Sequence, residues 1–181
     1  MQTICREMTD KYQLLSVTEL HLPTIYQWTH DEKHLEYYTC RPVQRSESLE
    51  DYTVKTLASI AEGKRLMYVL VHVDEPQTLL GRTTLFDINP RNHSAEFGYY
   101  LPEYNRGKGL GSVMLEKLLQ ISCEDKNLAL HKLYATTSSN NHPSVKLLER
   151  YKFQLEGRLR EHYWIEDQRY DQLIYSLLLH E

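Results

Sequence analysis

The segment that decides the fold is a glycine-rich turn, Asn105-Arg106-Gly107-Lys108-Gly109-Leu110-Gly111-Ser112. A strand-like run, Ser94 to Leu101, precedes this turn, and apolar residues at helical spacing follow it from Val113 to Ile121. Glycines let backbone N–H groups approach an anion closely, and the dipole at the N-terminus of a helix favours negative charge there. The sequence therefore predicts a pyrophosphate-binding turn between a strand and a helix.

Two other nucleotide-binding motifs do not fit the spacing of these glycines. A Walker A loop requires Ser or Thr directly after Gly-Lys, but Lys108 is followed by Gly109. A Rossmann motif, GxGxxG, begun at Gly107 would need glycine where Ser112 stands, and one begun at Gly109 would need glycine where Met114 stands. A domain that binds ATP or NAD is therefore a disfavoured alternative.

The pattern around the turn predicts an α/β domain with a mixed sheet, because strands and helices do not alternate strictly. We expect strands at residues 12–17, 66–73, 78–86, 94–101, 132–136, 153–163 and 170–178, with hairpin turns at 74–77 and 166–168. Helices are expected after Thr18 with Leu20, Leu22, Ile25 and Trp28 on one face, after Ser48 up to Gly63, after the glycine turn, and from Asn141 and Pro143 through Leu148.

Composition excludes several functional classes. The chain has 181 residues, enough for one domain spanning 1–181, and a formal net charge of −4 without a basic stripe, so nucleic acid is not an expected partner. No apolar run is long enough to span a bilayer, and the first residues do not form a signal peptide. We therefore expect a cytoplasmic protein with no membrane partner.

No metal site is expected. Cys5, Cys40 and Cys123 form an odd set without CxxC spacing, which indicates free thiols in a reducing compartment. His30 and His34 are four residues apart, but Asp31 replaces the glutamate that the zinc motif HExxH requires.

The spacing Arg106-x-x-Gly109-x-Gly111 resembles the pyrophosphate-binding motif of the GNAT superfamily of N-acetyltransferases, R/Q-x-x-G-x-G/A. The resemblance extends beyond this motif, from Ala95-Glu96-Phe97-Gly98-Tyr99-Tyr100-Leu101 to the final hairpin. Asn141-His142-Pro143-Ser144 and Leu147-Leu148-Glu149-Arg150-Tyr151-Lys152-Phe153 are similar to a stretch of the branch that contains the ribosomal-protein amino-terminal acetyltransferases. Lys152 departs from that branch, which usually has glycine there.

The resemblance implies a fold and an activity. The fold would be a central, mostly antiparallel mixed sheet of about seven strands, splayed in the middle, with helices on both faces. The activity would be transfer of the acetyl group of acetyl-CoA to a primary amine by direct attack, without a metal. The acceptor would be a protein N-terminus or a small-molecule amine, and a homodimer is possible by analogy. The alternative is a CoA-binding sensor or interaction module that has lost catalysis.

The cofactor-binding residues follow from the same resemblance. Acetyl-CoA would lie where the strands at 94–101 and 132–136 diverge, and its pantetheine arm would pair with their free backbone groups. The implied cofactor-binding residues are Tyr99, Tyr100, Leu101, Arg106, Gly107, Lys108, Gly109, Leu110, Gly111, Ser112, Asn141 and Ser144. Asn141 is also a good helix N-cap, and both roles are compatible.

The catalytic candidates come with alternatives. Glu96 is a candidate general base or else a structural carboxylate, and its side of the strand cannot be derived from sequence. Ser144 is a candidate general acid toward the thiolate or else a helix cap, since Leu148 replaces the tyrosine that other members use. Glu161 and Tyr163 are further base candidates, which strand periodicity places on one face. The acceptor wall is expected to include His34, Tyr37 and Tyr38.

Overall fold

The computed structural model describes residues 10–32, 39, 41, 46 and 48–180. Within them, seven strands form one sheet in the order β1-β2-β3-β4-β5-β7-β6. The strands are β1 (Tyr12–Ser16), β2 (Arg65–His72), β3 (Glu75–Asn89), β4 (Ser94–Tyr100), β5 (Lys132–Ser138), β6 (Gln154–Ile165) and β7 (Gln168–Leu178). The helices are η1 (Glu19–His21), α2 (Leu22–Asp31), α3 (Leu49–Ala61), η3 (Glu103–Asn105), α4 (Leu110–Glu124) and α5 (His142–Arg150).

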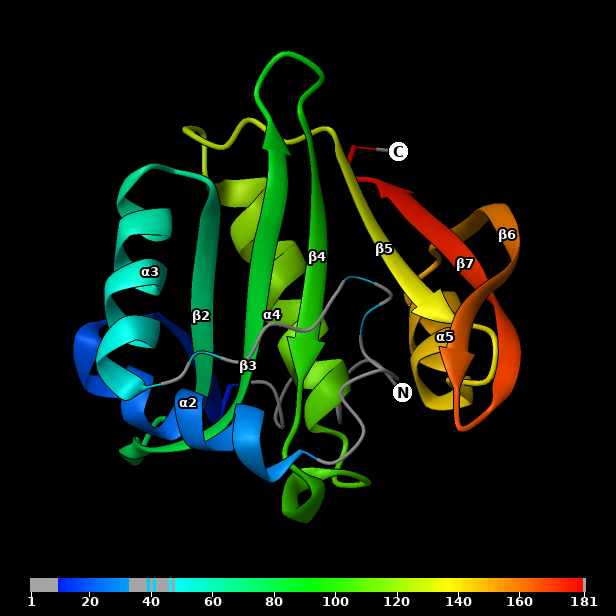
Figure 1. Cartoon of the computed structure of the whole chain (residues 1–181). Coiled ribbons are helices and arrows are strands. Elements are labelled where there is room, and N and C mark those ends of the chain that lie inside the picture. Colours follow the sequence, from blue (N-terminus) through cyan, green and yellow to red (C-terminus); the bar gives the residue numbers. More distant parts are fainter. Residues whose placement is uncertain (1–9, 33–38, 40, 42–45, 47, 181) are drawn as a thin grey trace.

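Helices cover both faces of this sheet (Figure 1). Helices α2 and α3 pack on one face through a cluster that includes Ile25, Trp28 and Val69. Helices α4 and α5 share the opposite face, where Leu115 and Leu148 belong to one cluster. Both the predicted mixed sheet and the predicted placement of helices on its two faces are confirmed.

The sheet opens in its middle. Strands β4 and β5 are parallel neighbours, but they pair only over Ser94–Glu96 and Lys132–Tyr134. Beyond that point β4 continues its antiparallel pairing with β3, and β5 continues with β7. The facing edges at 97–100 and 135–138 therefore present backbone groups that form no ladder with each other, as the resemblance to the GNAT fold predicted.

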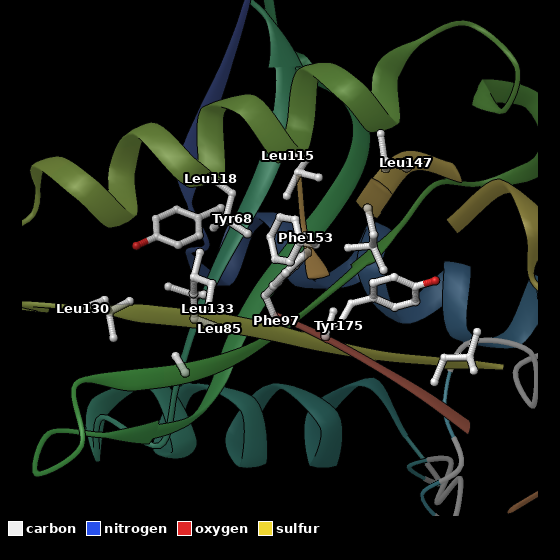
Figure 2. Packing of buried hydrophobic residues seen from close by; sticks show 14 residues of the cluster. Tyr68, Leu85, Phe97, Leu115, Leu118, Leu130, Leu133, Leu147, Phe153 and Tyr175 are labelled. Atoms are coloured by element: carbon white, nitrogen blue, oxygen red, sulfur yellow. The ribbon is translucent and has the colours of Figure 1, made fainter. Parts of the chain in front are cut away.

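The core behind the splay fixes the two strands. Phe97 on β4 packs against Phe153, which follows α5, with ring centroids 5.5 Å apart (Figure 2). Leu118 on α4 and Leu133 on β5 are fully buried in the same cluster. Burial of a large apolar side chain stabilises the fold by about 1.5–3 kcal/mol, so this cluster holds β4 and β5 firmly on either side of the opening.

The first helix begins later than its sequence pattern predicts. Thr18 is extended and precedes the short 3-10 turn η1, and α2 begins only at Leu22 with Pro23 in its first turn. The prediction that Leu20 shares the buried face is wrong, because η1 turns this side chain outward and leaves it 88% exposed. Leu22, Ile25 and Trp28 are buried as predicted.

The hairpin between β2 and β3 is tighter than predicted. The expected turn at 74–77 is wrong, since β3 already begins at Glu75 and Glu75 pairs with His72. Register shifts beside Val71 absorb the irregularity, as β-bulges do. Strand β3 is 15 residues long and pairs with β2 on one side and with β4 on the other.

Candidate active site

A cavity of about 770 Å³ lies where β4 and β5 diverge. Both strands, the turn before α4 and the first turns of α5 line it. Of the cofactor-binding residues expected from the sequence, nine line this cavity: Tyr99, Leu101, Arg106, Gly107, Gly109, Gly111, Ser112, Asn141 and Ser144. The structure thus brings together the glycine turn, the open strand edge and the start of α5.

The glycine turn has the backbone that an anion site needs. Gly107 and Gly109 have φ values of 75° and 79°, in the left-handed region that favours glycine. Gly109 is also the N-cap of α4, so the first N–H groups of a 15-residue helix point toward the cavity end of the turn. The N–H of Ser112 already binds the carbonyl of Gly109, so the N–H groups before it and the helix dipole together favour a pyrophosphate.

Two polar side chains fix the turn to the sheet. The amide of Asn105 is buried and donates a hydrogen bond to the carbonyl of Leu80 at 2.9 Å. Arg106 donates from Nε to the carbonyl of Leu101 at 2.9 Å and forms an ion pair with Glu32. Glu32 is only 8% exposed and lines the cavity, and sequence reasoning missed it because it lies 74 positions from Arg106.

Three expected cofactor residues direct their side chains elsewhere. Tyr100 packs against Trp28 with ring centroids 5.9 Å apart, and Leu110 is buried against α4 neighbours in the core. Lys108 lies at the surface and reaches Asn105 at 3.3 Å. Any contact of Tyr100 or Leu110 with a cofactor would therefore use the backbone, which is how the sequence interpretation assigned Tyr100.

The start of α5 places Asn141 and Ser144 at the cavity. Asn141 is the N-cap of α5, and its Oδ1 accepts a hydrogen bond from the backbone N–H of Ser144 at 3.3 Å. The Oγ of Ser144 in turn accepts a hydrogen bond from the phenol of Tyr99 at 3.1 Å. Burial raises the pKa of this phenol, which keeps it protonated as a donor.

Glu96 lies at the point where β4 and β5 separate. Its carboxylate accepts a hydrogen bond from Thr136 Oγ1 at 2.8 Å and pairs with Arg41 at 2.9 Å. Because Ala95 and Phe97 belong to the cluster under α4, strand alternation turns Glu96 to the opposite face, toward α2 and α3. The structure thus answers the question of strand side that the sequence left open.

Burial dominates the electrostatics of Glu96. The residue is 6% exposed, and desolvation raises the pKa of its carboxyl above the ordinary value. The hydrogen bond from Thr136 and the charge of Arg41 act in the opposite direction, while Asp87 again raises the pKa. A bulge in β3, where Asp87 has a φ of 50°, brings Asp87 within 2.5 Å of Arg41.

Glu161 and Tyr163 do not share a strand face, so that expectation is wrong. The register between β6 and β7 shifts between Leu159 and Tyr163, and Glu161 within the shift has a φ of 53°. The bulge leaves Glu161 exposed, with its N–H bound to Asp171 Oδ1, whereas Tyr163 is 2% exposed. Neither residue lines the cavity.

The remaining expectations concern the acceptor wall, a metal site and membrane-spanning helices. His34, Tyr37 and Tyr38 lie outside the described residues. No group of three or more His, Cys, Asp or Glu side chains that could hold a metal ion occurs in the part of the chain that the structure describes. Across the same residues, no helix is long and apolar enough to cross a membrane.

Comparison with known families identifies the family of this chain. Residues 13–154 match the family described as Acetyltransferase (GNAT) domain. This chain belongs to the GNAT acetyltransferase family. The match covers most of the chain and confirms the predicted fold and the predicted class of enzyme, an acyl-CoA-dependent N-acetyltransferase.

Several known proteins are similar to this GNAT chain. It is 32% identical over 120 residues to the uncharacterized N-acetyltransferase p20 of Bacillus licheniformis, covering 66% of each chain. It is 26% identical to the spermidine N(1)-acetyltransferase of Vibrio cholerae, covering 91% of each chain. It is also 26% identical to the ribosomal-protein-serine acetyltransferase of Escherichia coli, covering 96% of each, which confirms the predicted branch.

A solved structure shares the fold. The spermidine N-acetyltransferase from Vibrio cholerae, in complex with CoA and spermine, superposes with a TM-score of 0.83 at 23% identity. The superposition covers 94% of this chain and 96% of that chain. The fold is therefore shared over nearly the full length of both proteins.

Proposed function

We propose that this protein transfers the acetyl group of acetyl-CoA to a primary amine in a ternary complex at the opening between β4 and β5. One observation carries the proposal: the opening combines free strand edges, an anion-binding helix N-terminus and a cavity of about 770 Å³. The similarity to acetyltransferases of spermidine and of ribosomal proteins supports an amine acceptor. We also propose that residues 1–181 act as a single domain.

The residues of the cavity fit the parts of acetyl-CoA. The glycine turn offers backbone N–H groups to a pyrophosphate, and the edge at 97–100 offers strand-like pairing to a pantetheine arm. Lys146 and Arg150, one helical turn apart on α5, add positive charge to the lining. Acetyl-CoA supplies the thioester that an amine can attack.

Glu96 would act as the general base. An amine attacks only when neutral, and an alkylammonium loses its proton well above neutral pH, so the site must take up that proton. The raised pKa of the buried Glu96 carboxyl makes it a better acceptor near neutrality than an exposed glutamate. Its place at the strand separation brings it next to the cavity, which its partner Thr136 lines.

Two further groups would stabilise charge. A backbone N–H of the open edge of β4 can polarise the thioester carbonyl, as donors of an oxyanion hole do. Ser144 Oγ lines the cavity from the first turn of α5 and can donate to the leaving sulfur. Together with Glu96 as the base, these two groups account for the deprotonation of the amine, its attack on the thioester and the departure of the thiol.

The acceptor site would lie on the face that carries Glu96 and α2. The charges described there are mixed, since Arg41 stands between Asp87 and Glu96. This mixture does not select between a polyamine and a peptide N-terminus. We propose a primary amine as the acceptor class, and a homodimer remains a prediction.

The test is acetyl-CoA binding by calorimetry combined with thiol release over a panel of amines. The panel contains polyamines, amino acids, amino sugars and short peptides with free N-termini. Turnover with one class would support the enzyme and name its acceptor. Acetyl-CoA binding without turnover on any amine would favour the sensor alternative. Binding of ATP or NAD in place of acetyl-CoA would contradict the interpretation of the glycine turn as a site for the pyrophosphate of CoA.

A further inference from the structure

Two hydroxyl groups meet across the cavity on the face of α4 and α5. Tyr99 projects from β4 and Ser144 from the first turn of α5, and their oxygens are 3.1 Å apart. Both residues line the cavity. Tyr99 also packs against both apolar clusters of this face, which holds its ring in place. The contact therefore spans the opening at a fixed position.

The chemistry of the two groups sets the direction of the hydrogen bond. A phenol is far more acidic than an alkyl hydroxyl, so the phenol of Tyr99 is the better donor and Ser144 Oγ accepts. A serine hydroxyl carries one proton, and that proton is not used in this bond. The N–H of Ser144 is bound to Asn141, so the turn that carries the hydroxyl is fixed as well.

We propose that Tyr99 is a positioning residue, which holds Ser144 so that its O–H points into the cavity as a hydrogen-bond donor to the leaving sulfur. The inference rests on the proposed function, because it requires acetyl-CoA in this cavity. Donation from Tyr99 also polarises the Ser144 hydroxyl and strengthens its own donation, since linked hydrogen bonds reinforce one another.

The step balances without a further reactant. The C–S bond breaks and its electron pair stays on sulfur, where the Ser144 hydroxyl stabilises the charge. The ammonium has given its first proton to Glu96, which returns it to water after the product leaves, and the nitrogen loses its second proton to water. The thiolate takes a proton from water as it leaves the site, so Tyr99 and Ser144 both end the cycle unchanged.

Binding of CoA itself provides a readout that does not depend on activity. The thiol pKa of bound CoA, followed by ultraviolet absorbance of the thiolate, should lie below that of free CoA in the wild type. Tyr99→Phe, which keeps the ring, and Ser144→Ala should each move it back up. Calorimetry with desulfo-CoA is the control: Tyr99→Phe should weaken binding of CoA at alkaline pH about tenfold, and binding of desulfo-CoA much less. Equal weakening of both ligands would show that Tyr99 only shapes the cavity, and would overturn the proposal.

Kinetics of the double variant give the second test. Ser144→Ala should lower kcat about 100-fold and Tyr99→Phe about tenfold, with little change in the KM for acetyl-CoA. Because Tyr99 acts through Ser144, the double variant should be no slower than Ser144→Ala alone. If the losses of kcat in the two single variants added up in the double variant, the role of Tyr99 would be overturned, whereas the proposed acetyl transfer would stand. A wild-type protein that neither binds acetyl-CoA nor releases thiol would overturn the proposed function, and this inference with it.

Discussion

Glu96 and Thr136 face each other across the point where β4 and β5 separate, with 2.8 Å between Glu96 Oε1 and Thr136 Oγ1. Each residue lies within two positions of the last paired residues of the two strands. The same contact therefore closes the apex of the opening and partly offsets the burial that raises the pKa of the proposed base. A test of the base has to separate these two effects.

Replacement of Glu96 tests the base directly. Glu96→Gln keeps the shape of the side chain but cannot accept the proton of the ammonium. We expect kcat/KM at neutral pH to fall by about 10²–10⁴-fold, the usual contribution of a general base, while acetyl-CoA binding is retained. Steady-state kinetics and calorimetry on the same preparation measure both quantities. Near-normal turnover would exclude Glu96 as the base.

The same replacement should stabilise the fold at neutral pH. Because the pKa of the Glu96 carboxyl is raised in the folded state, the folded protein holds this proton more tightly than the unfolded chain. The carboxyl of Glu96 therefore contributes most to stability at pH values below its pKa in the unfolded chain. This contribution declines as pH rises toward and through its pKa in the folded protein. Urea denaturation from about pH 4 to about pH 8 should show a smaller decline for Glu96→Gln than for the wild type. If the free energy of unfolding declined equally with pH in Glu96→Gln and in the wild type, the raised pKa of Glu96 would be contradicted.

Thr136→Val isolates the hydrogen bond at the apex. Valine has nearly the same shape, but it removes the donor that lowers the pKa of Glu96. The carboxyl pKa should therefore rise further, and the acidic limb of the kcat/KM profile should move to higher pH than in the wild type. At alkaline pH the variant should approach the wild-type rate. An acidic limb that stays in place, or moves to lower pH, would show that another group titrates there.

The glycine turn allows a matched comparison. Gly107 and Gly63 have φ values of 75° and 68°, and a Cβ on either would meet nothing within 4 Å. Alanine at either position should cost about 1–2 kcal/mol in the free energy of unfolding through backbone strain alone. Only Gly107→Ala should weaken acetyl-CoA binding, because only that turn lines the cavity. If Gly63→Ala weakened binding as much, the loss would reflect stability and not the site.

Lys152 departs from the usual glycine at a position where glycine has a physical advantage. It follows α5 with a φ of 67°, in the left-handed region. Lys152→Gly should raise the free energy of unfolding by roughly 0.5–1 kcal/mol, while Lys152→Val should lower it. Urea denaturation checks both variants, and neither should change kcat. If Lys152→Gly lowered the free energy of unfolding, the lysine side chain would contribute more stability than its left-handed backbone conformation costs.

Local patterns predicted the parts of the fold that depend on local physics. The turn at Gly107 and Gly109 could be identified because only glycine adopts such φ values without strain, and the helical period after it marked α4. Apolar patterns located the central strands, and helical spacing identified Leu22, Ile25 and Trp28 as the buried residues of α2, although it also placed Leu20 with them. The splay and the position of Ser144 came from resemblance to a family, since no local pattern encodes where two distant strands stop pairing.

The remaining features depend on contacts between distant residues or on irregular backbone. The bulge around Glu161 broke the alternation that placed it with Tyr163, and a period of two cannot reveal extra residues. The bulge that carries Asp87 likewise aimed its carboxylate at Arg41. The sequence assigned Tyr99 to the cofactor only through its backbone. The contact of its phenol with Ser144 joins residues 45 positions apart, so no local pattern could reveal it.

The most direct test of the central claim is a calorimetric titration of the wild-type protein with acetyl-CoA, alongside ATP and NAD. We expect saturable binding of acetyl-CoA at one site per chain, weakened in Gly107→Ala and retained in Gly63→Ala, with no comparable binding of ATP or NAD. Absence of acetyl-CoA binding, or preferential binding of ATP or NAD, would contradict the assignment of the opening between β4 and β5.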